Sequence, residues 1–90
     1  MRLFSLEDLD SIFLSPYTQV SITENQLVIH QTLFDCTAVL HCSSRHSVRL
    51  LELMDRGTTE EEFLLFISRV LPDTNGEELL SLWMQMGVLE

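Results

Sequence analysis

The spacing of hydrophobic and polar residues changes along the chain and predicts its secondary structure. Residues 5–14 carry apolar side chains at weak helical spacing, which predicts a short N-terminal helix that ends before Pro16. Residues 18–23 alternate, and residues 26–31 are rich in branched side chains, so the two segments predict a β-hairpin. Residues 36–42 predict a third short strand. The first half of the chain is therefore expected to form a small antiparallel sheet.

The second half of the chain has a helical period with clear start and stop signals. A serine, Ser43 or Ser44, caps a first helix that Gly57 ends. Residues 58–61, Thr-Thr-Glu-Glu, form a capping box that opens a second helix. Residues 75–78, Asn-Gly-Glu-Glu, are a second candidate box and open a third helix.

These elements predict one small α+β domain. Residues 17–90 contain the three-stranded antiparallel sheet and the three helices that follow it, and residues 1–16 form an N-terminal segment. A chain of 90 residues buries only about 60% of its unfolded surface, which leaves little room for a deep catalytic pocket. Neither a recognisable nucleophilic triad nor a glycine-rich phosphate loop is present. We therefore expect no catalytic residues and no cofactor, and we expect that the protein is not an enzyme.

The charge of the chain narrows the classes of partner. The formal net charge is -9, with no lysine and five arginines. Nucleic acids and anionic membranes are bound by clustered basic residues, so neither is expected as a partner. No apolar run approaches the ~20 residues of a membrane span, and the N-terminus lacks the pattern of a signal peptide. These observations predict a cytoplasmic protein.

Four residues with metal-binding chemistry lie close together in the sequence. They are Cys36, His41, Cys42 and His46. Their spacing does not match the zinc-ligand patterns. A strand over residues 36–42 would also separate the two cysteines by about 20 Å, which excludes both a shared metal and a disulfide between them. We expect no metal site.

The third helix has an unusually wide apolar face. At about 100° per residue its apolar side chains cover roughly 200°, whereas an ordinary core-facing stripe starts at about 100°. One interpretation is a central core helix. The other is that one flank, formed by Leu80 and Met84, stays open and lines a groove. On the second helix, Leu65 falls among polar residues, which makes it a candidate contact for a partner protein. On the first helix, Glu52 has the spacing to pair with Arg49 or Arg56.

The third strand is a candidate binding site because of its place in the sheet. In a three-stranded meander this strand lies at an edge. A sheet edge offers unpaired N–H and C=O groups, to which an extended peptide can add as a further strand. An edge strand beside an apolar helix flank would make a two-part peptide site, with affinity from the backbone and selectivity from the side chains.

Several of these features resemble the PqqD-like family, whose members are also called RiPP recognition elements. Residues 50–61 are similar to the family's leucine-rich helix, glycine stop and Thr-Glu-Glu helix start. Leu79, Leu80, Trp83 and residues 87–90 look like its closing helix and tail. The resemblance covers about residues 17–90 and implies a winged-helix-like domain.

The resemblance also implies a function. Members of the family bind the leader of a ribosomally made precursor peptide as an added strand. They present it to a modifying enzyme, such as a radical-SAM maturase or a cyclodehydratase. The positions that match the peptide site are Thr37, Ala38, Val39, Leu40, His41, Leu80, Trp83 and Met84. The third strand departs from the aromatic-rich strand of many members, and residues 1–16 have no clear counterpart.

Two other functions stay open at this point. A regulatory or assembly subunit would contact a protein surface and bind no short peptide. A winged-helix transcription factor would need a basic recognition helix, and the third helix contains no arginine. A homodimer is compatible with each of these functions.

Overall fold

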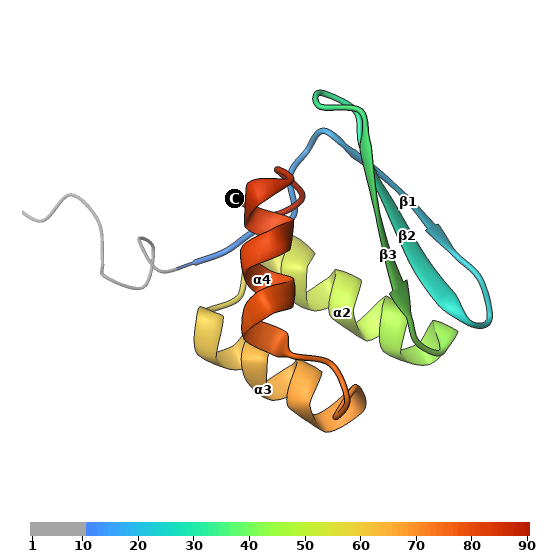
Figure 1. The fold of residues 1–90 in the computed structure, drawn as a ribbon, viewed down its shortest axis with the longest axis vertical. Helices are drawn as coiled ribbons and strands as arrows, with labels where there is room; N and C mark the ends of the chain where they lie inside the picture. Colours follow the sequence, from blue (N-terminus) through green and yellow to red (C-terminus); the bar gives the residue numbers. More distant parts are fainter. Residues whose placement is uncertain (1–10) are drawn as a thin grey trace, which may run out of the picture.

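The computed structural model describes residues 11–90 and has the strand-then-helix order that the sequence predicts (Figure 1). The strands are β1 (Thr18–Ile22), β2 (Gln26–Gln31) and β3 (Cys36–His41). The helices are α2 (Ser44–Arg56), α3 (Glu60–Val70) and α4 (Gly76–Gln85). The strands form one antiparallel sheet in the order β1-β2-β3. The predicted α+β fold, a three-stranded antiparallel sheet followed by three helices, is confirmed.

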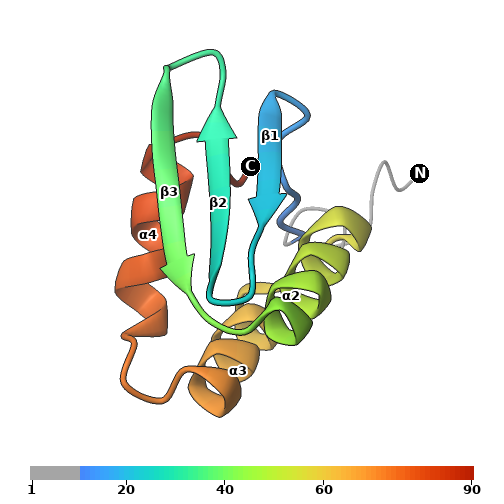
Figure 2. The ribbon, with the colours of Figure 1, turned by 90° about the vertical axis from the view of Figure 1, so that its right-hand side faces the viewer.

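The helices lie on one side of the sheet, and the core is buried between the two layers (Figures 1 and 2). Alternate residues of β2 and β3 face this core: Leu27, Ile29, Ala38 and Leu40. The helices contribute Leu50, Met54, Phe63, Ile67, Leu80 and Trp83. The strand side chains between the buried ones face away from the helices and are exposed or half-buried. This alternation is the period of two that a sheet with one solvated face requires.

Local capping sets where the helices begin. Ser43 caps α2, and its hydroxyl accepts a hydrogen bond from the backbone N–H of His46. The capping box of α3 is formed by Thr59 and Glu62, one residue later than predicted. The reason is that Thr58 is buried and exchanges two backbone hydrogen bonds with Ile12, which leaves Thr59 to cap the helix. Among residues 11–90, no helix combines the length and the apolar character needed to cross a bilayer.

The N-terminal segment is extended where the structure describes it. A helix over residues 5–14 is wrong for residues 11–14, and residues 5–10 lie outside the described part of the chain. Phe13 exchanges two backbone hydrogen bonds with Glu90, and the Ser15 N–H donates to the Val88 carbonyl. Residues 12–15 are thus paired with the C-terminal tail and the α2–α3 turn, and they form part of the packed domain.

Candidate functional site

The β1–β2 ladder determines which backbone groups of the sheet are paired. At its two ends, the Thr23 N–H donates to the Gln26 carbonyl and the Thr32 N–H donates to the Tyr17 carbonyl, each over 2.9 Å. Both pairs are in register with the ladder. Hydrogen-bonded and non-bonded pairs alternate along antiparallel strands. The even-numbered residues of β2 therefore turn their N–H and C=O groups toward β1, and the odd-numbered residues turn theirs toward β3.

The same alternation determines which groups of β3 are free. Leu27 of β2 lies opposite Leu40 of β3, so the even-numbered residues of β3 bond to β2. The odd-numbered residues point their N–H and C=O groups out of the sheet; they are Thr37, Val39 and His41. Since β3 is last in the sheet, no strand among residues 11–90 pairs with them. These groups form an open edge onto which another strand can add.

The five predicted strand residues divide between the two faces of the sheet. Thr37, Val39 and His41 have exposed side chains on the outer face. Ala38 and Leu40 are buried against the helices. An added strand would therefore form hydrogen bonds with the backbone of Thr37, Val39 and His41. The side chains that it points to the inner face of the sheet would lie over the helices.

The predicted residues of α4 do not form an open groove beside β3. Trp83 is only 1% exposed, and its ring packs edge-on against Phe63, with the centroids 6.3 Å apart. Leu80 is buried as well. The expectation that a Leu80–Met84 flank stays open is thus wrong for the exposure of Leu80, while Met84 is 45% exposed. Leu80 and Met84 do line one hollow, of about 370 Å³, but they share it with Ile12 and other residues away from the sheet.

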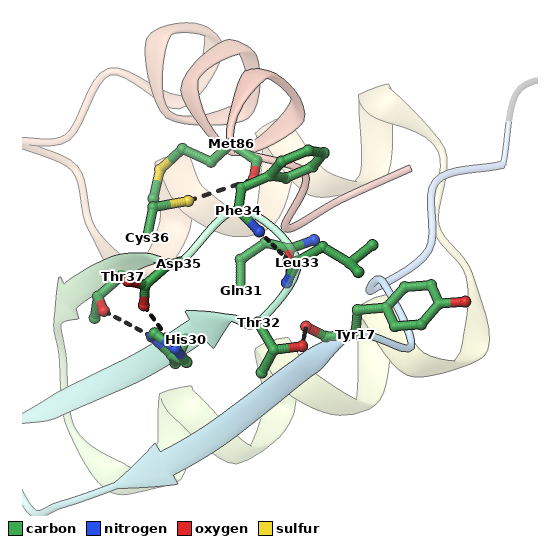
Figure 3. Close-up of polar contacts among 10 residues, drawn as sticks. All are labelled: Tyr17, His30, Gln31, Thr32, Leu33, Phe34, Asp35, Cys36, Thr37 and Met86. Carbon is green, nitrogen blue, oxygen red and sulfur yellow. Dashed lines mark hydrogen bonds and ion pairs between the residues drawn. The ribbon is translucent and has the colours of Figure 1, made fainter.

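A different flank of α4 faces β3. The C-terminal end of α4 lies beside the start of β3, where the Cys36 thiol donates a hydrogen bond to the Met86 carbonyl over 3.6 Å (Figure 3). Leu79, Leu82 and Met86 share one stripe, because they are spaced by three and seven residues. This stripe lies on the opposite side of Trp83 from Met84. Leu82 is 51% exposed, so it is the accessible apolar side chain of this flank. Sequence reasoning placed Leu82 in the apolar arc but did not select it.

A buried glutamine holds this end of the molecule together. Gln31 is 1% exposed, and its Nε2 donates to the Gly87 carbonyl over 2.8 Å. Its Oε1 accepts from the backbone N–H groups of Leu33 and Phe34 in the β2–β3 loop. Phe34 also packs against Gly87, where a Cβ atom would lie 2.8 Å from its ring. One polar side chain therefore joins the β2–β3 loop to the tail that follows α4.

The outer face of β2 and β3 carries a His–Thr–Asp cluster that sequence reasoning missed (Figure 3). His30 lies opposite Thr37, and its Nδ1 is 3.1 Å from the Thr37 hydroxyl. Its Nε2 is 3.4 Å from a carboxylate oxygen of Asp35, a residue of the turn with a positive φ of 49°. The side chain of Asp35 is 92% exposed. The cluster is open to solvent, whereas an activated nucleophile needs a shielded site. The contacts are those of a cross-strand pair that supports the turn.

The remaining candidates are separated in space. Leu65 is 52% exposed, which confirms that it lies on the polar side of α3. Cys36 and Cys42 are free thiols at opposite ends of β3. Cys42 lies beside the Ser47 hydroxyl, 3.2 Å away. Within residues 11–90, no three His, Cys, Asp or Glu side chains are arranged to hold a metal ion.

Comparison with known proteins does not identify a family or a function for this site. No protein-family model matches the chain, and no curated protein matches it significantly. The resemblance to the PqqD-like family therefore stays a prediction.

Proposed function

We propose that the protein binds an extended peptide as a fourth strand along β3. The observation that supports this proposal is the open β3 edge, where the backbone groups of Thr37, Val39 and His41 point outward. Main-chain hydrogen bonds to this edge supply affinity that depends little on the peptide's sequence. Leu82 and the half-buried Leu79 and Met86 of α4 supply an apolar surface for the peptide's inward side chains.

The identity of the peptide follows from the resemblance described above. In a PqqD-like protein the peptide is the leader of a ribosomally made precursor, and the bound leader is presented to a modifying enzyme. The chain's acidic character is compatible with a leader that carries basic residues. On this proposal the protein is an accessory binding subunit, and the chemistry belongs to its partner enzyme.

A transcription-factor role is less well supported. In a winged-helix reader the last helix would enter the DNA groove with basic side chains. Here the first turn of α4 carries Glu77 and Glu78, and the helix contains no lysine or arginine. Sequence-specific binding of duplex DNA at physiological salt would overturn the peptide proposal in favour of this alternative.

The proposal is tested with two proline variants at the two edges of the sheet. Peptides are selected from a displayed random library on the immobilised full-length chain, and the best peptide is resynthesised and titrated by calorimetry. Val39→Pro removes an outward N–H from β3, and Val20→Pro removes one from β1. We expect Val39→Pro to weaken binding at least about tenfold, or about 1.4 kcal/mol, and Val20→Pro to leave it within about twofold.

Two results would contradict the proposal. One is a selection that yields no peptide with measurable affinity. The other is a peptide that Val39→Pro binds as tightly as the parent chain does, which would place its site away from the β3 edge. Circular dichroism of both variants confirms that the comparison is made between folded proteins.

A further inference from the structure

A hollow of about 420 Å³ lies between α2 and α3, on a part of the surface unrelated to the β3 edge. Its apolar lining is formed by Leu53, Leu65, Phe66 and Val70. Leu65 is the most exposed of these four residues, and the other three are half-buried. This arrangement gives the hollow, here called the α2–α3 groove, a hydrophobic floor with one accessible leucine.

Three arginines surround this floor, and His46 and Glu62, the carboxylate that pairs with Arg56, complete its polar lining. Arg45 and Arg49 lie one turn apart near the start of α2, and Arg69 lies in the last turn of α3. A link of three residues reverses the chain between the helices and brings the start of α2 beside the end of α3 (Figure 2). Residues 11–90 contain four arginines, and three of them line this groove, although the whole chain has a net charge of -9.

The three arginines have no partner in the described part of the protein. Among residues 11–90, one ion pair involves an arginine: the Arg56 guanidinium lies 3.9 Å from the Glu62 carboxylate. The side chains of Arg45, Arg49 and Arg69 form neither an ion pair nor a hydrogen bond there. The Arg49–Glu52 pair that the sequence spacing allows is absent. Like charges spaced i, i+4 on a helix destabilise it, so the fold gains no stability from placing Arg45 and Arg49 together.

We propose that the α2–α3 groove docks an acidic amphipathic segment of a partner protein. Arginine binds carboxylates in a bidentate geometry, so Arg45, Arg49 and Arg69 suit glutamate or aspartate side chains on such a segment. Its apolar face would cover Leu65 and Phe66, in the way that an amphipathic helix occupies a hydrophobic groove. This inference does not depend on peptide binding at β3.

The surroundings of the groove favour a polypeptide over a nucleic acid. Glu52 and Asp55 line the adjoining hollow on one side, and Glu61 and Glu62 line the one on the other. A phosphate backbone carries a charge at every nucleotide and would be repelled by these carboxylates along its length, whereas a polypeptide segment can present its carboxylates to the three arginines alone. Phosphate groups would also leave the apolar floor uncovered, whereas leucine side chains bury it.

The test uses a synthetic fluorescein-labelled peptide with leucines at helical spacing and glutamates at the other positions. Two comparison peptides are a version with lysines in place of the glutamates and a scrambled version of the same composition. Each is titrated into the full-length chain by fluorescence anisotropy. We expect the acidic amphipathic peptide to bind at least about tenfold more tightly than either comparison peptide, with an affinity that falls as salt is raised.

Matched variants locate the site. We expect the double variant Arg49→Gln/Arg69→Gln, and separately Leu65→Glu, to weaken binding about tenfold or more. Val48→Glu is the control for Leu65→Glu, because Val48 is also an exposed apolar residue of a helix but does not line the groove. Val39→Pro should leave binding of this peptide unchanged. Each variant is checked by thermal melting, and the arginine variants should melt no lower than the parent, since they remove repulsion.

Several outcomes would overturn the proposal. They are equal binding of the lysine or scrambled peptide, loss of binding in Val48→Glu to the same extent as in Leu65→Glu, and full binding by the double arginine variant. Binding of RNA that requires the same arginines would assign the groove to nucleic acid instead. A concentration-dependent dimer that the arginine variants dissociate would assign the groove to a second copy of the chain.

Discussion

The two edges of the sheet have the same backbone pattern but different surroundings. On β1 the outward groups belong to Thr18, Val20 and Ile22, and on β3 they belong to the odd-numbered residues. Beside β1, Val20 lines a hollow together with Leu14 of the N-terminal segment and two carboxylates of α2. Beside the start of β3 lies the C-terminal end of α4, whose apolar stripe includes the exposed Leu82.

The proposed peptide site at β3 thus differs from a bare sheet edge in having an apolar neighbour. Backbone groups at an edge accept any extended chain, because every residue except proline presents the same donor and acceptor. A neighbouring apolar surface selects some side chains over others and adds affinity. By this criterion β3 is the better edge for binding a peptide. The comparison can be tested with variants of the β3 backbone, of the glutamine that contacts the tail after α4, and of the exposed side chains of α4.

The largest expected effect is the loss of stability caused by proline at Leu40. The N–H of Leu40 bonds to β2, so Leu40→Pro leaves the Leu27 carbonyl without its donor and removes a buried side chain. We expect the free energy of unfolding to fall by about 3 kcal/mol or more. Val39→Pro, whose N–H points outward, should cost only about 1 kcal/mol. Urea unfolding of both variants makes the comparison, and equal losses would show that the assigned hydrogen-bond pattern of β3 is wrong.

A smaller loss of stability is expected when Gln31, which joins the β2–β3 loop to the tail after α4, is replaced. Gln31→Leu removes the bond to the Gly87 carbonyl and leaves the Leu33 N–H without its acceptor. We expect a loss of about 2 kcal/mol in the free energy of unfolding. Gln19→Leu, at an exposed glutamine of β1, is the control and should change stability by less than about 0.5 kcal/mol. If Gln31→Leu left the free energy of unfolding unchanged, packing alone would hold α4 beside β3.

The smallest expected effect concerns the two flanks of α4. Leu82→Glu and Met84→Glu introduce the same charge at two exposed positions of one helix. We expect Leu82→Glu to weaken binding of the selected peptide about tenfold, or about 1.4 kcal/mol, and Met84→Glu to weaken it less than about twofold. Calorimetric titration measures both. The reverse order would place the peptide over the flank that faces Ile12 instead of the flank that faces β3.

The local parts of the fold could be predicted from sequence because their signals are local. Alternation in β2 and β3, the Ser43 cap and the glycine stop after α2 are each encoded within a few residues. The N-terminal segment was mispredicted because three consecutive apolar residues at 12–14 fit a helix as well as a strand. Its partners, Thr58 and Glu90, lie far away in the sequence.

The candidate sites depend on contacts that the sequence does not reveal. A helical wheel showed that α4 has a wide apolar arc, but the side that faces β3 depends on the contacts of Gln31 with the tail after α4. The spacing of Arg45 and Arg49 is visible in the sequence, whereas the approach of Arg69 requires α3 to pack against α2. The sequence therefore predicted the edge strand correctly, whereas the helix flank that it selected, Leu80 and Met84, lines a hollow with Ile12.

The most direct test of the central claim is amide chemical-shift mapping of the full-length chain with the selected peptide. Strand addition along β3 predicts that the largest shifts fall on Thr37, Val39 and His41, whose N–H groups would exchange water for a peptide carbonyl. Smaller shifts are expected at Leu79, Leu82 and Met86. Largest shifts on β1 or α3, with the amides of β3 unchanged, would contradict the claim that β3 is the peptide-binding edge.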